Sequence, residues 1–169
     1  TVLGRLHQND GNKFVCGFAK YQVRPCVVYS FGSRGDTNFE AAVHELNPEC
    51  EIHTFDPTLQ NQDKAVLAGL YKDNRFILHE EGLAGSKTVF PNVGPVNTLS
   101  NIAASLNHSM IDVLKVDIES SEYSFMEEWV QSAARRGPSV AQILIEVHEV
   151  DHATSSRFRQ MVRQFEDLG

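Results

Sequence analysis

The chain has 169 residues, of which 41% are hydrophobic and 22% charged, and its formal net charge is −7 at pH 7. This composition is ordinary for one globular domain, and its apolar stretches are too short to span a bilayer. The negative charge argues against a nucleic-acid partner, which needs a basic stripe for its phosphates. A small or neutral substrate, or a basic protein surface, suits this charge better. We expect a small-molecule or glycan acceptor, and no nucleic-acid or membrane contact by this segment.

The chain contains three cysteines, Cys16, Cys26 and Cys50. No CxxC pair is present, so a structural zinc site of that type is unsupported. Cys16 and Cys26 can form a disulfide in an oxidising compartment, which would leave Cys50 unpaired. Buried free thiols are the alternative, and both interpretations stay open.

Short apolar runs alternate with helical periodicity from residue 26 onward. Residues 26–31 form a predicted strand that ends in a glycine-containing loop. Thr37 and Glu40 then fit a capping box, in which each side chain binds a free backbone N–H of the helix start. Apolar residues at helical spacing predict a helix up to residue 46.

The same alternation continues to the end of the chain. Further strands are predicted at 51–56, 75–79, 111–117 and 140–148. Further helices are predicted at 62–71, 99–106, 125–130 and 158–165. Residues 82–97 contain three Gly and two Pro and are expected to form a loop, with a short strand near 88–90. We treat residues 1–25 as a lead-in segment and 26–169 as the domain.

Strands that alternate with helices predict an α/β fold with a mostly parallel sheet. Open sheets of this kind bind ligands beyond the carboxyl ends of their strands. Function is therefore sought at five segments that follow the strands and are rich in Gly or acidic residues, namely 31–36, 56–58, 80–85, 117–122 and 146–149.

The first two strand ends fit a nucleoside-binding site. Gly32 and Gly35 let the backbone approach a ligand closely, and the following helix start offers free N–H groups to a carboxylate or a phosphate. Asp56 ends the second strand, where Rossmann-like sheets accept hydrogen bonds from ribose hydroxyls. A plain βα turn and a turn-forming Asp before Pro57 are the alternatives. The full GxGxxG dinucleotide motif is missing.

The fourth and fifth predicted strands end in alternating polar pairs, Asp117 with Glu119 and Glu146 with His148. Alternate residues of a strand share a face, so these side chains converge if the two strands are neighbours. Such a group can deprotonate a hydroxyl or hold a divalent metal.

Other roles are open for several of these side chains. Glu119 and Glu122 can be helix-start acids, the interpretation we prefer for Glu122. His148 can be a structural histidine. Lys115 lies on a strand that we expect to be buried, and a buried ammonium needs a carboxylate partner such as Asp117 or Glu146.

Four blocks of the sequence resemble the FkbM-like methyltransferases. They are Cys26-Val-Val-Tyr-Ser-Phe-Gly32, Ile52-His-Thr-Phe-Asp-Pro57, Ile111-Asp-Val-Leu-Lys-Val-Asp-Ile-Glu119 and Ile145-Glu-Val-His148. The resemblance covers about residues 14–150 in the order of that family. It implies a Rossmann-like class I methyltransferase fold with helices on both faces of the sheet, S-adenosylmethionine as cofactor, and O-methylation of a hydroxyl.

By the same resemblance, the cofactor's methionine end lies on Gly32, Ser33, Gly35 and Asp36. Asp56 holds the ribose, Gly82 and Leu83 lie near the adenine, and Asp117 and Glu119 face the transferring methyl group. Two features depart from the family. Ser120 and Ser121 replace the Gly-Ala of the family's Glu-Gly-Ala-Glu block, and five strands are predicted where the fold has seven. The C-terminal strands are therefore absent, or the sheet is completed in another way.

Methyl transfer to a hydroxyl needs a proton acceptor, which we assign to His148 or Asp117, while Glu119 and Glu146 orient the acceptor or bind a metal. A divalent metal is an open alternative. Two rival functions are a catalytically silent binding module and a nicotinamide-dependent oxidoreductase, which the missing GxGxxG disfavours. A secretory or membrane-anchored parent protein and a cytoplasmic one fit the sequence equally.

Overall fold

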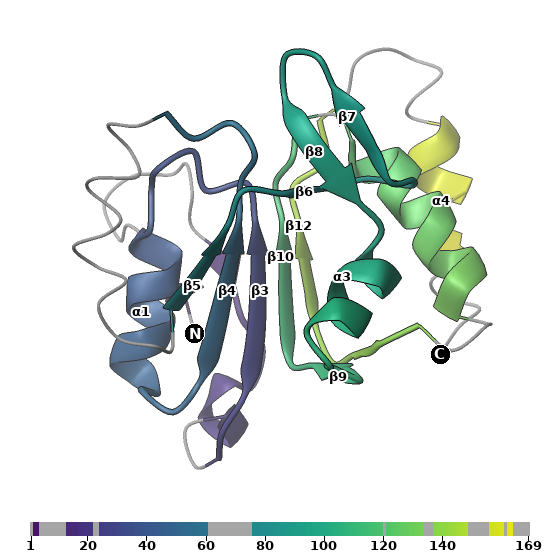
Figure 1. Ribbon diagram of the computed structural model, residues 1–169. Coiled ribbons are helices and arrows are strands. Elements are labelled where there is room, and N and C mark those ends of the chain that lie inside the picture. The colour runs from purple at the N-terminus through teal and green to yellow at the C-terminus, as the bar shows by residue number, and fades with distance from the viewer. Residues whose placement is uncertain are drawn as a thin grey trace.

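The computed structural model describes residues 2–3, 13–21, 24–60, 76–119, 121–133, 137–148, 156–160 and 162–163. The helix predicted at 62–71 lies outside these residues. A five-stranded sheet forms the centre of the molecule, with helices on both sides (Figure 1). Among the described helices, none is long and apolar enough to cross a membrane.

The central sheet is parallel throughout, which confirms the predicted α/β fold. Its strands, in chain order, are β3 (Val27–Phe31), β4 (Glu51–Phe55), β5 (Phe76–His79), β10 (Val113–Val116) and β12 (Ile143–Ile145). Their spatial order is β12-β10-β3-β4-β5. The order reverses between β3 and β10, and this switch point is where a Rossmann-like sheet opens a ligand crevice.

Both faces of the sheet are covered because apolar side chains point both ways along its strands. On one face, Val28 and Ile52 pack with Phe39 and Val43 of α1 (Asn38–Leu46). The other face packs against α3 (Leu99–Ser105) and α4 (Glu122–Ala133). Its fully buried core residues include Tyr29, Phe31, Phe55, Leu99, Ile102 and Phe125.

The lead-in segment packs against the α1 side of the sheet. It contains β1 (Val2–Leu3), β2 (Lys13–Phe14) and a 3-10 helix, η1 (Phe18–Tyr21). β1 and β2 form an antiparallel pair. Leu3, Val15 and Tyr21 are buried in the same core cluster as Val28. This packing fixes the position of Lys13 at the start of β2.

Two long predicted strands are interrupted. The first is split into β9 (Met110–Ile111) and β10, and the second into β11 (Ser139–Val140) and β12. β9 and β11 form a small parallel sheet of their own. The first break is at Asp112, whose buried carboxylate accepts the Val27 N–H at 2.9 Å and pairs with Arg24. A carboxylate inside the sheet needs such partners, and it interrupts the regular ladder to reach them.

The predicted capping box at the start of α1 is wrong. Thr37 occupies the N-cap position, but its side chain makes no capping hydrogen bond. Asp36 supplies the acceptor instead, taking the Asn38 N–H at 3.0 Å. Glu40 is turned into the interior and is 1% exposed, so it does not reach back to the helix start.

The proposed Cys16–Cys26 disulfide is also wrong, as is the alternative of free buried thiols. Cys26 is bonded to Cys50, whereas Cys16 is free and exposed. The disulfide joins the segments that lead into β3 and β4, the first two strands of the central sheet. Sequence spacing alone does not identify this pair, because the two cysteines become neighbours only when these strands align.

Residues 82–97 are more regular than the predicted loop. They contain β6 (Gly82–Leu83), β7 (Thr88–Phe90) and β8 (Gly94–Asn97), in the order β6-β8-β7. β7 confirms the short strand predicted near residue 88, and it forms a hairpin with β8 that rises beyond the central sheet (Figure 1).

In the predicted C-terminal helix, residues 156–160 and 162–163 are helical. Phe158 and Val162, which the helical spacing places on one apolar face, are both exposed. Met161 and Phe165, the other two members of that face, lie outside the described residues.

A cleft at the switch point of the sheet

A cleft of about 730 Å³ lies at the carboxyl ends of the central strands. Its size is typical of a cofactor or small-molecule site. Apart from Gly35, every site residue predicted from the sequence contributes to its lining. These residues are Gly32, Ser33, Asp36, Asp56, Gly82, Leu83, Asp117, Glu119, Glu146 and His148.

Gly32 is required by the backbone around the switch point. Its φ is +77°, a region that side-chain-bearing residues avoid. A Cβ at this position would lie 1.7 Å from the carbonyl oxygen of Asp117. The Gly32 N–H donates to the Phe55 carbonyl at 3.0 Å. The loop after β3 is therefore packed directly on the end of β10, which brings the two halves of the cleft together.

Asp56 shapes this loop from the end of β4. Its buried carboxylate accepts the backbone N–H groups of Ser33 at 3.1 Å and Arg34 at 2.6 Å. The other oxygen accepts the N–H and the hydroxyl of Thr58, at 2.9 and 2.6 Å. Asp56 lines the cleft as expected, and both of its carboxylate oxygens accept hydrogen bonds from the protein. Its ribose-binding role stays a prediction.

The side of the cleft near the third strand is apolar. Gly82 and Leu83 are buried, and Val93 and Val96 line the cleft beside them. A Cβ on Gly82 would lie 3.0 to 3.2 Å from Pro57 and Val96 side-chain atoms. The wall is thus closely packed where the resemblance places the adenine.

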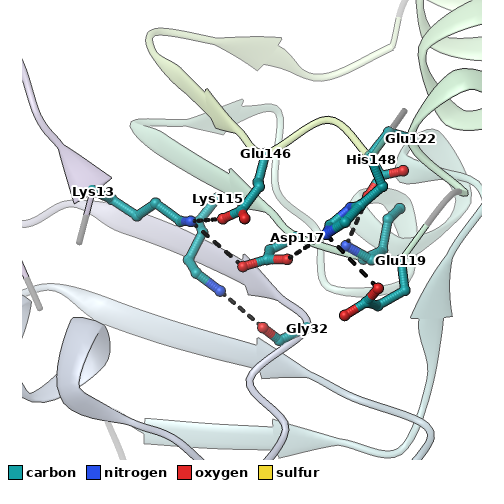
Figure 2. A network of polar contacts seen from close by, with 9 residues as sticks. Lys13, Gly32, Lys115, Asp117, Glu119, Glu122, Glu146 and His148 are labelled. Carbon is teal, nitrogen blue, oxygen red and sulfur yellow. Dashed lines mark hydrogen bonds and ion pairs between the residues drawn. The ribbon is translucent and has the colours of Figure 1, made fainter. Parts of the chain in front are cut away.

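The opposite side of the cleft is charged. β10 and β12 are neighbours with Val116 beside Ile145, so the residues that follow them, Asp117 and Glu146, lie at the same edge. His148 Nε2 lies 4.0 Å from Asp117 and 3.7 Å from Glu119 (Figure 2). The structure therefore brings all four predicted polar side chains together.

Lys13, which was not predicted from the sequence, joins this group from the lead-in segment. Its ammonium pairs with Glu146 and lies 3.4 Å from Asp117 (Figure 2). Burial lowers the pKa of Lys13, but the hydrogen bond to Glu146 and the charge of Asp117 outweigh it and raise the pKa overall. The same hydrogen bond lowers the pKa of Glu146. No motif marks Lys13, since its partners lie more than 100 residues away in sequence.

Lys115 does not pair with either predicted carboxylate. Its Nζ donates to the Gly32 carbonyl at 2.9 Å, which ties the glycine loop to β10 (Figure 2). Its charge also acts on Glu40, the buried carboxyl of α1. Burial is the larger influence there and raises the pKa of Glu40. Lys115 is thus placed to hold the loop in position.

Glu122 begins α4, as the helix-start interpretation predicted, and it also contacts the polar group. Its Oε1 accepts the Ile118 N–H at 3.2 Å and lies 2.8 Å from His148 Nδ1. This hydrogen bond is the main cause of a raised pKa of His148. Because Nδ1 faces Glu122, Nε2 is the nitrogen that faces Asp117 and Glu119. The pairing of an imidazole with a buried carboxylate is a common way to orient a catalytic histidine.

Glu119 has a strained backbone. Its φ is +51°, although it carries a side chain. Non-glycine residues in this region cost about 1–3 kcal/mol and cluster at functional sites. In this conformation the Glu119 side chain lies beside His148 (Figure 2).

The comparisons with known proteins agree with this architecture. The family model described as "Methyltransferase domain" matches residues 2–167. Similar proteins include the probable methyltransferase-like protein 24 of Rattus norvegicus, 28% identical over 134 residues, which cover 75% of this chain and 34% of the relative. The protein of the same name from Homo sapiens is 28% identical over 131 residues, covering 76% and 34%. The chain thus spans about a third of the length of these relatives.

The family match includes the lead-in segment that carries Lys13 as well as all five strands of the central sheet. Their order and the cleft at their switch point are those of a Rossmann-like methyltransferase fold. With a match over nearly its whole length, the chain belongs to the methyltransferase-domain family.

Proposed function

We propose that this domain transfers a methyl group from S-adenosylmethionine to a hydroxyl oxygen of a small-molecule or glycan acceptor. The observation that carries the proposal is the switch-point cleft, where the Gly32 loop meets the group formed by Asp117, Glu146 and His148. The resemblance to FkbM-like enzymes supports O-methylation as the finer assignment. The similar proteins from rat and human are named as probable methyltransferase-like proteins, which is consistent with methyl transfer.

The residues of the cleft fit the parts of this cofactor. The loop at Gly32 and Ser33 offers backbone to the methionine end, Asp56 stands at the ribose position, and Leu83 and Val96 give an apolar wall for the adenine. The cofactor supplies an electrophilic methyl group on a sulfonium. The protein's task is to align the acceptor oxygen and to remove its proton.

We assign the removal of the proton to His148. Glu122 holds Nδ1, so Nε2 is free to accept a proton from a hydroxyl in the cleft. Asp117 and Glu119 lie near Nε2 and stabilise the imidazolium that results. Asp117, Glu146 and His148 are also close enough to hold a metal ion. Lys13 already provides a positive charge to both carboxylates, so the proposed reaction uses no metal.

The proposal is tested by two measurements on the purified domain. Calorimetric titration with S-adenosylhomocysteine measures cofactor binding, and transfer of labelled methyl to a panel of sugars, phenols and alcohols measures turnover. Asp117→Asn and His148→Gln should bind the cofactor product as the wild type does but lose at least 100-fold in turnover. Glu49→Gln removes one negative charge from an exposed residue outside the cleft, and this variant should keep both cofactor binding and turnover.

Unchanged turnover in Asp117→Asn and His148→Gln would contradict the assigned roles. The silent binding module is favoured by one observation, the ion pairs that Lys13 makes with the two carboxylates. Micromolar binding without turnover across the panel would support that module in place of an enzyme. Absence of binding in a folded sample would contradict the cofactor assignment itself.

A further inference from the structure

A second group of ionisable side chains lies away from the cleft. Glu51 and His53 alternate along β4 and so share one face of the sheet. His108 follows α3 and covers the same face, beside Tyr29 of β3. Glu51 begins β4, whereas Asp56 in the cleft follows its end, about 16 Å further along the strand. The cleft proposed for methyl transfer uses none of these residues.

Three ligand atoms converge in this group. His53 Nε2 lies 2.7 Å from Glu51 Oε1, and His108 Nε2 lies 3.8 Å from the same oxygen. All three atoms are within 4.8 Å of one another. Tetrahedral zinc with ligand bonds of about 2.05 Å holds its ligand atoms about 3.3 Å apart. The observed spacings lie on either side of that value, so small side-chain movements are enough to bind an ion.

The other nitrogen of each histidine has its own partner. His53 Nδ1 lies 2.9 Å from His79 Nε2, and His108 Nδ1 lies 2.8 Å from the Tyr29 hydroxyl. With metal on Nε2, each Nδ1–H donates to that partner. Partners of this kind fix the tautomer and the ring orientation of metal-binding histidines. Both imidazoles are thereby held with Nε2 toward Glu51.

The charged residues around Glu51 favour metal binding at this group over metal binding in the cleft. In the cleft, Lys13 pairs with two of the three potential ligands. Around Glu51, the ion pairs found among the described residues are with His53 and His108, and none is with Lys or Arg. His53 is 1% exposed, whereas the Glu51 side chain is 44% exposed. An ion can therefore enter from the Glu51 side and reach a buried imidazole.

We propose that Glu51, His53 and His108 form a binding site for a divalent transition metal, separate from the methyl-transfer cleft. Two imidazoles and one carboxylate suit Zn²⁺, with water in the fourth position. The bound ion joins the start of β4 to the segment between α3 and β9. Its function is to stabilise that end of the sheet, and the proposal is independent of the activity of the cleft.

The test is Zn²⁺ binding by the chelator-treated domain at pH 7.5, followed by calorimetry and by thermal unfolding. All proteins carry Cys16→Ser, which removes the exposed free thiol as a ligand. We expect one equivalent of Zn²⁺ to bind and to raise the unfolding temperature. Glu51→Gln and His108→Gln should weaken binding at least 10-fold. Both leave the buried His53 in place, and their circular dichroism without metal should match the parent.

Variants in the cleft serve as the matched control. Asp117→Asn and His148→Gln remove two of the three potential ligands there, and they should bind Zn²⁺ as tightly as the parent. No binding by the parent would overturn the proposal, as would undiminished binding in Glu51→Gln and His108→Gln. If only the cleft variants lost Zn²⁺ binding, the ion would lie at Asp117, and this result would also overturn the proposal.

Discussion

His148 is the side chain on which the proposed chemistry depends, and its environment sets the pH at which it works. The hydrogen bond to Glu122 raises the pKa of His148, so the ring is protonated over more of the neutral range than a free histidine. Only the neutral ring can accept a proton from a hydroxyl. Turnover should therefore rise with pH as His148 loses its proton, above the ordinary histidine value of about 6.5.

Glu122→Gln should move this pH profile toward lower pH. The amide keeps an oxygen for the Ile118 N–H but loses the negative charge that stabilises the imidazolium. A nuclear magnetic resonance titration of the His148 ring measures the shift without an activity assay, and we expect the pKa to fall. Glu127→Gln, an exposed change on the same helix, should leave it in place. An unchanged His148 titration in Glu122→Gln would contradict the pairing.

Gly32 permits a second test at the level of one residue. Gly32→Ala must place a Cβ against the Asp117 carbonyl at a positive φ, and we expect a loss of about 3 kcal/mol in the free energy of unfolding. Gly17 also has a positive φ, of +56°, but has no atom within 4 Å of its Cβ position. Gly17→Ala should cost only about 1 kcal/mol. Urea denaturation of both variants measures the difference, and equal losses would mean that the contact with Asp117 is unimportant.

At the level of elements, the lead-in segment completes the site by placing β2 beside the ends of β10 and β12. Lys13→Gln removes the ammonium that pairs with Glu146 and Asp117, and the pKa of Glu146 should rise. A carboxyl whose pKa is lowered by folding stabilises the fold at pH values above its pKa in the unfolded chain, near 4.5. This contribution is lost as the pH falls through the pKa of the folded state. Lys13→Gln should therefore lower stability at pH 7 more than at pH 3.

The expected loss at pH 7 is about 1 kcal/mol, since Glu146 is partly exposed. Urea denaturation at the two pH values measures it. Lys87→Gln replaces an exposed lysine and should change stability at neither pH. If Lys13→Gln behaved like Lys87→Gln, the lead-in segment would contribute packing alone.

For the whole molecule, the sequence predicted what depends on local pattern. Alternating strands and helices predicted the parallel sheet, and the strand ends predicted the residues of the cleft. What it missed depends on contacts between distant segments. Lys13 reaches Glu146, Cys26 finds Cys50, and Asp112 interrupts a strand to bind Arg24. Such contacts leave no periodicity in the sequence, because the folded sheet alone brings the partners together.

The pH dependence of global stability should show the opposite effects of the two histidine groups. Burial lowers the pKa of His79 to about 4 and also lowers that of His53. Between pH 4 and 6.5 these two imidazoles therefore bind more protons in the unfolded chain than in the folded one, and their contribution to stability should rise with pH, by at most about 1.4 kcal/mol per pH unit for each proton. His148 acts in the other direction: its raised pKa stabilises the fold below 6.5, and this contribution is lost as pH rises through the folded value.

The combined contribution of these two histidine groups to stability should consequently be greatest near pH 6.5. Urea denaturation from pH 4 to 9, with chelator present, measures the curve. His79→Gln should flatten its acid side, because the amide can still face His53 but takes up no proton on unfolding. Glu122→Gln should flatten the alkaline side, because it removes the main cause of the raised pKa of His148. If stability falls as steeply with decreasing pH in His79→Gln as in the wild type, then carboxyl groups, and not the buried imidazoles, control unfolding in acid.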